Sequence, residues 1–197
     1  MTIGQLSEAV RVCLAEAARE GRAVPDLERQ AEEARAERVT VATSIRETLP
    51  AFVRQGHPAN LETRIGSPGL LAFARSVPGV SWLILGPTGA GKTVAAALAF
   101  RRLLAAGVAD PGVPWFMAAG ASWYDASELA RARRGWPLGQ GDPPEHERAA
   151  RASILFLDDL GQERLDDGSV RDVLNARYES ERPTVVTTGL RMSELVT

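Results

Sequence analysis

The residues of this chain with the clearest chemical potential lie in one glycine-rich segment. Glycines lack a Cβ and tolerate positive φ, so a loop built from them can wrap a phosphate and turn its N–H groups inward. The ammonium group of Lys92 can then reach β and γ phosphates, and the hydroxyl of Thr93 can ligate Mg²⁺. Lys92 is the only lysine in the chain. The segment fits the spacing G-x-x-x-x-G-K-[ST] and reads Gly86-Pro87-Thr88-Gly89-Ala90-Gly91-Lys92-Thr93.

Two acidic residues after an apolar run supply the second part of the predicted site. Residues 154–157 (Ile-Leu-Phe-Leu) are followed by Asp158 and Asp159. In open α/β sheets, ligands bind at the carboxyl ends of the strands. Asp158 is suited to hold Mg²⁺, directly or through water, and Asp159 to orient and polarise an attacking water. Alone, such a run indicates a strand that enters a solvated turn. In a chain that carries a phosphate-binding motif, it indicates a nucleotide site.

Together these segments predict a P-loop that binds ATP and Mg²⁺. The predicted metal ligands are Thr93 and Asp158. The other metal-binding residue types are scarce, since Cys13 is the only cysteine and His57 and His146 are the only histidines. A zinc site is therefore not expected. The predicted nucleotide-binding residues are Gly86, Pro87, Thr88, Gly89, Ala90, Gly91, Lys92, Thr93 and Val94.

Two motifs further along the chain connect these segments to a family. They are Arg177-Tyr178 and residues 183–190 (Pro-Thr-Val-Val-Thr-Thr-Gly-Leu). With the glycine-rich segment and residues 155–161 (Leu-Phe-Leu-Asp-Asp-Leu-Gly), they resemble the DnaC-type AAA+ ATPases over residues 80–196. This resemblance implies a helicase loader of bacteria or phages, or a relative of the IstB-type transposition helpers. In such loaders the N-terminal segment contacts the helicase, which by analogy is the role of residues 1–60.

The chain departs from the family pattern in two ways. Where the family usually has a sensor asparagine, this chain has Gly189, whose missing side chain cannot hydrogen-bond a phosphate or water. Thr187 or Thr188 would have to substitute, and we assign Thr188 to the catalytic set with Lys92 and Asp159. The sequence also stops at position 197, before the family's fifth strand and the arginine that reaches a neighbouring subunit's ATP. We therefore expect an incomplete core, with the first strand unpaired on one side.

The elements that would position these residues follow from apolar spacing and turn signals. Strands are predicted at 82–85, 113–119, 153–157 and 184–188. Helices are predicted at 6–20, 25–49, 68–76 (capped by Ser67), 92–106, 126–134, 145–152 and 168–181, with a linker over 50–66. Strands that alternate with helices indicate βαβ units. The predicted fold class is thus α/β, an AAA+ type P-loop NTPase whose parallel sheet has helices on both faces.

Charge and composition limit the possible partners. The net charge of −2 gives no general attraction to nucleic acid, so any such contact needs a local patch. Arg131, Arg133 and Arg134 form a candidate patch for single-stranded DNA, with Trp123-Tyr124 before them and Trp136 after them. The favoured alternative is a helix that shows a charged face to solvent.

The leading interpretation is an ATP-hydrolysing helicase loader from a phage or mobile element. It has a helical arm and linker at 1–60 and an ATPase core at 61–197, and it assembles as a homo-oligomer through the ATP site. Its partner is a replicative helicase, or a transposase in the alternative that it is a transposition helper. A third interpretation, a nucleotide-gated binding module with negligible hydrolysis, is favoured by Gly189 and the missing arginine. Without a membrane-length apolar run or a secretion signal, we expect a cytoplasmic protein with no membrane contact.

Overall fold

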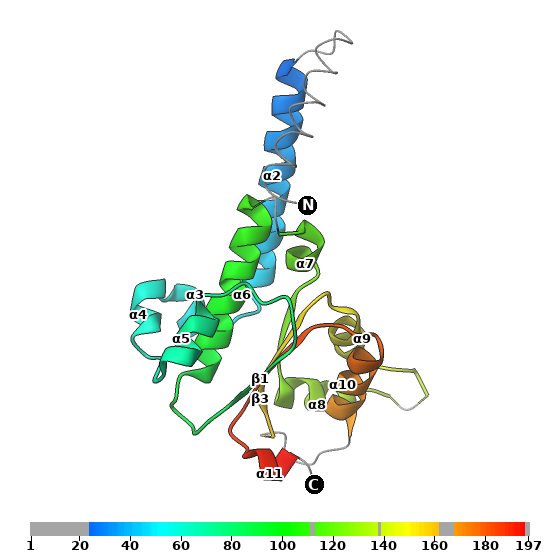
Figure 1. Ribbon diagram of the computed structural model, residues 1–197. Helices are drawn as coiled ribbons and strands as arrows, with labels where there is room; N and C mark the ends of the chain where they lie inside the picture. Colours follow the sequence, from blue (N-terminus) through cyan, green and yellow to red (C-terminus); the bar gives the residue numbers. More distant parts are fainter. Residues whose placement is uncertain (1–23, 111–112, 138, 162–167, 196–197) are drawn as a thin grey trace.

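The computed structural model describes residues 24–110, 113–137, 139–161 and 168–195 (Figure 1). The helix expected at 6–20 lies outside these residues. The strands are β1 (Trp82–Leu85), β2 (Ser122–Asp125), β3 (Leu155–Leu160) and β4 (Thr184–Thr188). The helices are α2 (Val24–Arg46), α3 (Ala51–Gln55), α4 (Pro58–Glu62), α5 (Pro68–Ala74), α6 (Lys92–Ala109), α7 (Trp115–Ala119), α8 (Ala126–Arg134), α9 (Pro144–Arg151), α10 (Ser169–Glu179) and α11 (Met192–Leu195).

The four strands form one sheet, and every neighbouring pair is parallel. Their order is β1-β4-β3-β2, so β4 lies between the first and third strands. Helices cover both faces: α5, α6 and α7 lie on one side, and α8, α9 and α10 on the other (Figure 1). The predicted α/β class with an all-parallel sheet is confirmed. Because the strands are parallel, their carboxyl ends meet at the same end of the sheet.

Alternation of side chains along β3 divides the interior into two clusters. Phe156 lies on the α6 face, where its ring packs against Phe100 and Trp123 with centroids 5.0 and 6.0 Å away. Leu155 and Leu157 point the other way, into a cluster with side chains of α8, α9 and α10. This period of two is the geometry of a pleated strand buried on both faces. It also decides on which face Asp158 lies.

The prediction of a strand at 113–119 is wrong. Residues 115–119 form the short helix α7, and the second strand follows at Ser122–Asp125. Pro114 precedes the first turn of α7, and Gly120 follows its last residue. The helix buries Ala118 against α6, where a Cβ on Gly107 would lie 2.3 Å from the Ala118 Cβ. A short apolar run does not by itself distinguish a buried strand from one helical turn.

Helix α6 is longer than expected. It was predicted to end at residue 106, but it continues through Gly107 to Ala109. The glycine is fully inside the interface with α7, where only a residue without a side chain fits. It is therefore a packing position. Ser67, in contrast, caps α5 as predicted, with its Oγ accepting a hydrogen bond from the Leu70 N–H at 3.2 Å.

The stretch 50–66, expected as a linker, contains the helices α3 and α4. Leu49, Val53 and Leu61 are buried in the same cluster as the apolar face of α6. Near its end, the preceding helix α2 contributes the partly buried Ala42 and Ile45 to this cluster. The segment between α2 and β1 is thus packed on α6, the helix that follows the glycine-rich loop.

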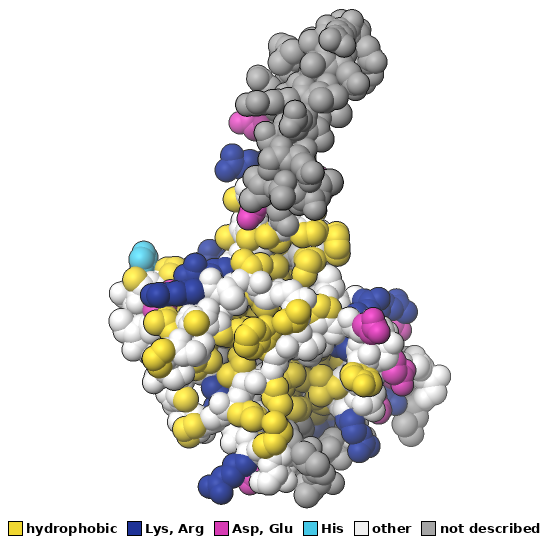
Figure 2. Space-filling model, viewed as in Figure 1, with side chains coloured by type: hydrophobic (Ala, Val, Ile, Leu, Met, Phe, Trp, Pro, Cys, Tyr) yellow, Lys and Arg dark blue, Asp and Glu magenta, His cyan; other side chains and the backbone are white. Residues whose placement is uncertain are grey.

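Among the described residues, strand β1 lies at an edge of the sheet and pairs with β4 alone. In this part of the chain one side of the strand is unpaired, as predicted, but the strand is not buried on both faces. Of its four residues only Ile84 is buried, while Trp82, Leu83 and Leu85 are 43, 46 and 38 % exposed. Hydrophobic side chains accordingly gather across the middle of the face shown in Figure 2, where Figure 1 has the sheet edge. None of the helices in the described part of the chain is both long and apolar enough to cross a lipid bilayer.

Candidate nucleotide-binding site

The glycine-rich loop, residues 86–91, connects β1 to α6. Its last residue, Gly91, stands before the first turn of α6 with a φ of 87°, which is unfavourable for a residue with a side chain. A Cβ at this position would also lie 2.5 Å from the carbonyl oxygen of Arg64. Both observations require glycine. The loop is therefore closely packed on the segment before β1, and the free N–H groups that begin α6 lie at its end.

Lys92 is the first residue of α6 and turns its side chain back over the loop. Its Nζ donates hydrogen bonds to the carbonyl oxygens of Gly86 and Pro87, at 2.8 and 3.0 Å. The residue is only 7 % exposed. The ammonium group thus lies within the concave side of the loop, with two carbonyl acceptors that a stronger anionic acceptor can replace.

Three segments meet at the carboxylate of Asp158. Its Oδ1 accepts a hydrogen bond from Thr93 Oγ1 at 3.0 Å and another from Thr187 Oγ1 at 2.5 Å. Thr93 belongs to the first turn of α6, and Thr187 to β4. The two predicted metal ligands, far apart in the sequence, are therefore in direct contact. A hydroxyl and a carboxylate are oxygen ligands of the kind that Mg²⁺ prefers.

The surroundings of Asp158 raise the pKa of its carboxyl group above the ordinary value. Burial is the main cause, because it disfavours the charged form. The hydrogen bonds from Thr187 and Thr93 act in the opposite direction, whereas the nearby charges of Asp159 and Asp125 add to the increase. A buried carboxylate in this position gains stability from a bound cation.

Asp159 sits at an irregularity of the sheet. The pairing of β3 with β4 shifts register between Leu157 and Leu160, and Asp159 has a φ of 57°, in the left-handed region. Its N–H donates to Thr187 Oγ1 at 3.1 Å. This backbone is unfavourable for a residue with a side chain, and such conformations gather at functional sites. Because of the irregularity, the side chains of these two neighbouring acids lie in different places. Asp158 contacts Thr93, and Asp159 lines a cavity.

The hydroxyl of Thr188 is engaged with the main chain. It donates to the carbonyl oxygen of Leu160 at 2.6 Å and accepts from the N–H of Leu190 at 3.0 Å. The neighbouring Thr187 is the one whose hydroxyl reaches Asp158. Strand parity could have indicated this, since Thr187 is two residues from Val185, which packs on the α6 face. Of the two threonines that could substitute for the sensor asparagine, Thr187 is thus the one in contact with Asp158, and not Thr188, which we assigned to the catalytic set.

A cavity of about 330 Å³ opens beside these groups. One side of it carries residues of the loop and of α6, and Asp159 and Gly189 stand at the carboxyl ends of β3 and β4. Two further residues come from the segment before β1 and were not foreseen, because nothing in their spacing marks them. The lining residues are Phe52, Arg64, Thr88, Gly89, Gly91, Lys92, Thr93, Val94, Asp159 and Gly189.

None of the three arginines of the candidate DNA patch lines this cavity. Arg131 and Arg134 are exposed on α8, while Arg133 donates to Gly141 and forms an ion pair with Asp142 at 3.3 Å. Trp123 is buried inside the sheet cluster, only 6 % exposed, so it cannot stack on a base. The aromatic part of that hypothesis is therefore wrong at Trp123.

Comparisons with known proteins do not assign the chain to a family. No protein-family model matches it, and no curated protein matches it significantly. In the part of the chain that the structure describes, no three or more His, Cys, Asp or Glu side chains gather as a metal cluster. The site that remains is the cavity at the carboxyl end of the parallel sheet, lined by Lys92, Thr88, Thr93 and Asp159, with Asp158 in contact with Thr93.

Proposed function

We propose that this protein is a P-loop NTPase of the AAA+ type that binds ATP with Mg²⁺ and hydrolyses it. The observation that carries the proposal is the contact of Thr93 with Asp158, beside a glycine-rich loop that encloses Lys92. A strand, a glycine-rich turn and a helix N-terminus, followed by a second strand that ends in an acid, are the parts that triphosphate sites combine.

Each residue has a distinct task in this proposal. The N–H groups of the loop and the ammonium of Lys92 bind the phosphates, in place of the carbonyl acceptors that Lys92 now has. Thr93 and Asp158 would hold Mg²⁺, which supplies neutralisation of the phosphate charge. Asp159 orients a water for attack on the γ-phosphorus. The bond from that phosphorus to the β–γ bridging oxygen breaks, giving ADP and inorganic phosphate, and the water's proton passes to Asp159 and then to solvent.

The DnaC-type resemblance suggests what this ATPase acts on. We propose that it loads a replicative helicase, with the helical segment before the sheet as the contact, and that it binds single-stranded DNA through Arg131, Arg133 and Arg134. Co-purification with a helicase or with a transposase distinguishes this role from that of a transposition helper. Replacing the three arginines with alanine should weaken DNA binding and lower its salt dependence. An unchanged salt slope would exclude them.

Two substitutions test the ATPase itself. We expect Lys92→Ala to abolish ATP binding, because the chain has no other lysine that could take its place. Asp159→Asn should bind ATP normally but release no phosphate, because the amide cannot accept the water's proton. Arg35→Ala, which removes an exposed charge from α2, serves as the control and should change neither property. ATP binding is measured by titration calorimetry and turnover by phosphate release.

The single lysine offers an independent readout of the same proposal. An amine-specific reagent can modify only Lys92 and the chain terminus, so peptide mass analysis reports on one side chain. ATP with Mg²⁺ should protect Lys92 from modification. Binding that survives Lys92→Ala, or modification that ATP does not slow, would contradict the role given to this residue.

A second candidate function is a nucleotide-gated binding module with negligible hydrolysis. It is favoured by Gly189, which lines the cavity without a side chain that could position a water. In that case ATP binds and stabilises the protein, but phosphate release stays at background with and without single-stranded DNA. The phosphate assay on the unmodified chain decides between the two.

A further inference from the structure

Phe52 and Arg64 form a pair among the residues that line the cavity. The guanidinium carbon of Arg64 lies over the ring of Phe52, 5.2 Å from its centroid. Both side chains line the cavity, and Phe52 is 45 % exposed although it is a large apolar residue. Among the described residues, no acid forms an ion pair with Arg64. The pair thus presents an aromatic ring and a planar cation toward an open space.

Helix α6 holds the segment that carries Phe52. The Nη1 of Arg101 donates to the carbonyl oxygens of Val53 and Gly56, at 3.0 and 2.9 Å. These acceptors flank the end of α3, directly after Phe52. The main chain around Phe52 is therefore fixed to the same helix that begins with Lys92.

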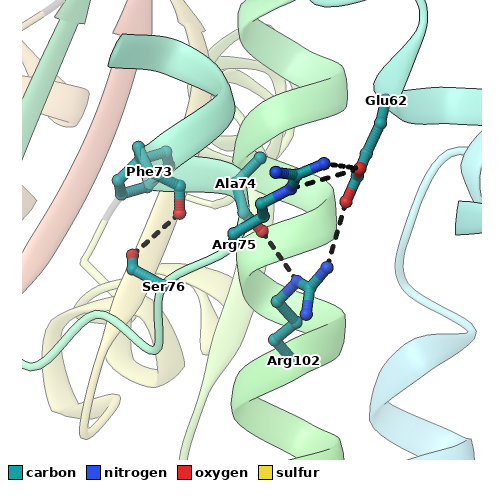
Figure 3. Close-up of polar contacts among 6 residues, drawn as sticks. All are labelled: Glu62, Phe73, Ala74, Arg75, Ser76 and Arg102. Atoms are coloured by element: carbon teal, nitrogen blue, oxygen red, sulfur yellow. Dashed lines mark hydrogen bonds and ion pairs between the residues drawn. The ribbon is translucent and has the colours of Figure 1, made fainter. Parts of the chain in front are cut away.

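A second set of contacts fixes the segment that carries Arg64. Glu62 accepts from Arg75 at 2.7 Å and from Arg102 at 3.0 Å, and Arg102 also donates to the carbonyl oxygen of Ala74 (Figure 3). These contacts join α4, α5 and α6 immediately before Arg64. The carbonyl oxygen of Arg64 then packs closely on Gly91. The position of the pair relative to the glycine-rich loop is accordingly built into the fold.

We propose that Arg64 recognises the nucleobase of the bound nucleotide and that Phe52 holds its guanidinium in place. This inference rests on the proposed function, and it identifies Arg64 and Phe52 as the residues that select the nucleotide. In the proposed function, the loop and Lys92 bind the phosphates of the nucleotide. The base of the same nucleotide then needs a flat binding partner that is held in place at the cavity wall. A guanidinium stacks on aromatic planes and on bases, and a ring on one face restricts its orientation.

The chemistry of the pair predicts which bases it accepts. Arginine offers only donors, and both adenine and guanine carry acceptors on their exposed edges. Glu62, two residues before Arg64, is not available to accept from donors of a base, because its two oxygens are occupied by Arg75 and Arg102. Stacking favours the larger purine surface over a pyrimidine. The site should therefore select purine nucleotides as a class rather than ATP alone.

Binding of four ligands tests the proposal: ATP, GTP, CTP and inorganic tripolyphosphate, each with Mg²⁺. They are titrated calorimetrically into the unmodified chain and into the variants Arg64→Ala, Arg64→Lys, Phe52→Ala and Arg35→Ala. Circular dichroism checks that each variant is folded. We expect GTP to bind about as tightly as ATP, and CTP more weakly. Both Arg64 variants should weaken ATP by about tenfold and leave tripolyphosphate unchanged, because lysine keeps the charge but loses the plane.

The remaining outcomes separate this inference from the proposed function. Equal ATP affinity in the chain and in Arg64→Ala, or full rescue by Arg64→Lys, would overturn base recognition while leaving the ATPase proposal standing. An equal loss of ATP and tripolyphosphate would overturn it too, since Arg64 would then act on phosphates. If the unmodified chain binds neither ligand, the proposed function itself fails. Phe52→Ala should weaken ATP and not tripolyphosphate, and Arg35→Ala should match the unmodified chain.

Discussion

Among single residues, Asp158 shows most clearly how a position with a proposed function can oppose stability. Its pKa is raised by burial, so between the ordinary value of about 3.9 and the higher folded value the folded state binds more protons than the unfolded state. The free energy of unfolding therefore falls as the pH rises through that window, and this loss is complete above the folded pKa. Above the folded pKa the protein holds a buried charge that a cation would compensate.

Asp158→Asn should consequently stabilise the protein in the absence of nucleotide. The amide keeps the shape and removes the charge. A gain on the order of 1 kcal/mol would raise the Tm by about 2–4 °C at pH 7 and less at acidic pH. With ATP and Mg²⁺ the order should reverse, because the unmodified chain gains stability from binding and the variant does not. Calorimetric melts check this, with Glu179→Gln as an exposed control. A variant that melts lower without ligand would contradict the assigned burial effect.

At the scale of elements, the packing of α7 on α6 leads to a specific prediction about stability. Alanine normally stabilises a helix interior relative to glycine by about 0.5–1 kcal/mol. At Gly107 the added Cβ would meet Ala118 at 2.3 Å, so Gly107→Ala should instead destabilise, by about 1–3 kcal/mol. Gly69→Ala in α5 is the matched control, because nothing lies within 4 Å of its Cβ position, and it should stabilise. Urea unfolding measures both. A stabilised Gly107→Ala would show that the two helices are not packed in this way.

The same elements show what the sequence could predict. The strands at 82–85 and 184–188, and the helix at 126–134, were predicted within their observed bounds because turn residues delimit strong local patterns. α7 was missed because its five residues are apolar without a helical period, and the tertiary contact decides their structure. Motif spacing brought Thr93 and Asp158 into one predicted site. Phe52 and Arg64 could not be predicted, since their place depends on how α3 and α4 pack on α6.

At the scale of the whole molecule, the open edge of the sheet is a surface through which copies of the chain can associate. In the part of the chain that the structure describes, β1 pairs on one side only, and its half-exposed side chains include Leu83. An unpaired apolar edge favours association between chains. The oligomer that we propose through the ATP site requires nucleotide, whereas edge association does not. The two routes are therefore separable by adding or omitting ATP.

Leu83→Lys should suppress the nucleotide-independent route. A charge on an edge strand disfavours pairing with another strand and leaves the chain's own core in place, because Leu83 is 46 % exposed. Val39→Lys is the control, since Val39 is 48 % exposed but lies on α2. In sedimentation velocity without ATP, we expect association that grows with concentration for the unmodified chain and for Val39→Lys, and a monomer for Leu83→Lys. If all three sediment alike, the edge of β1 does not govern assembly, and any oligomer must form through another surface.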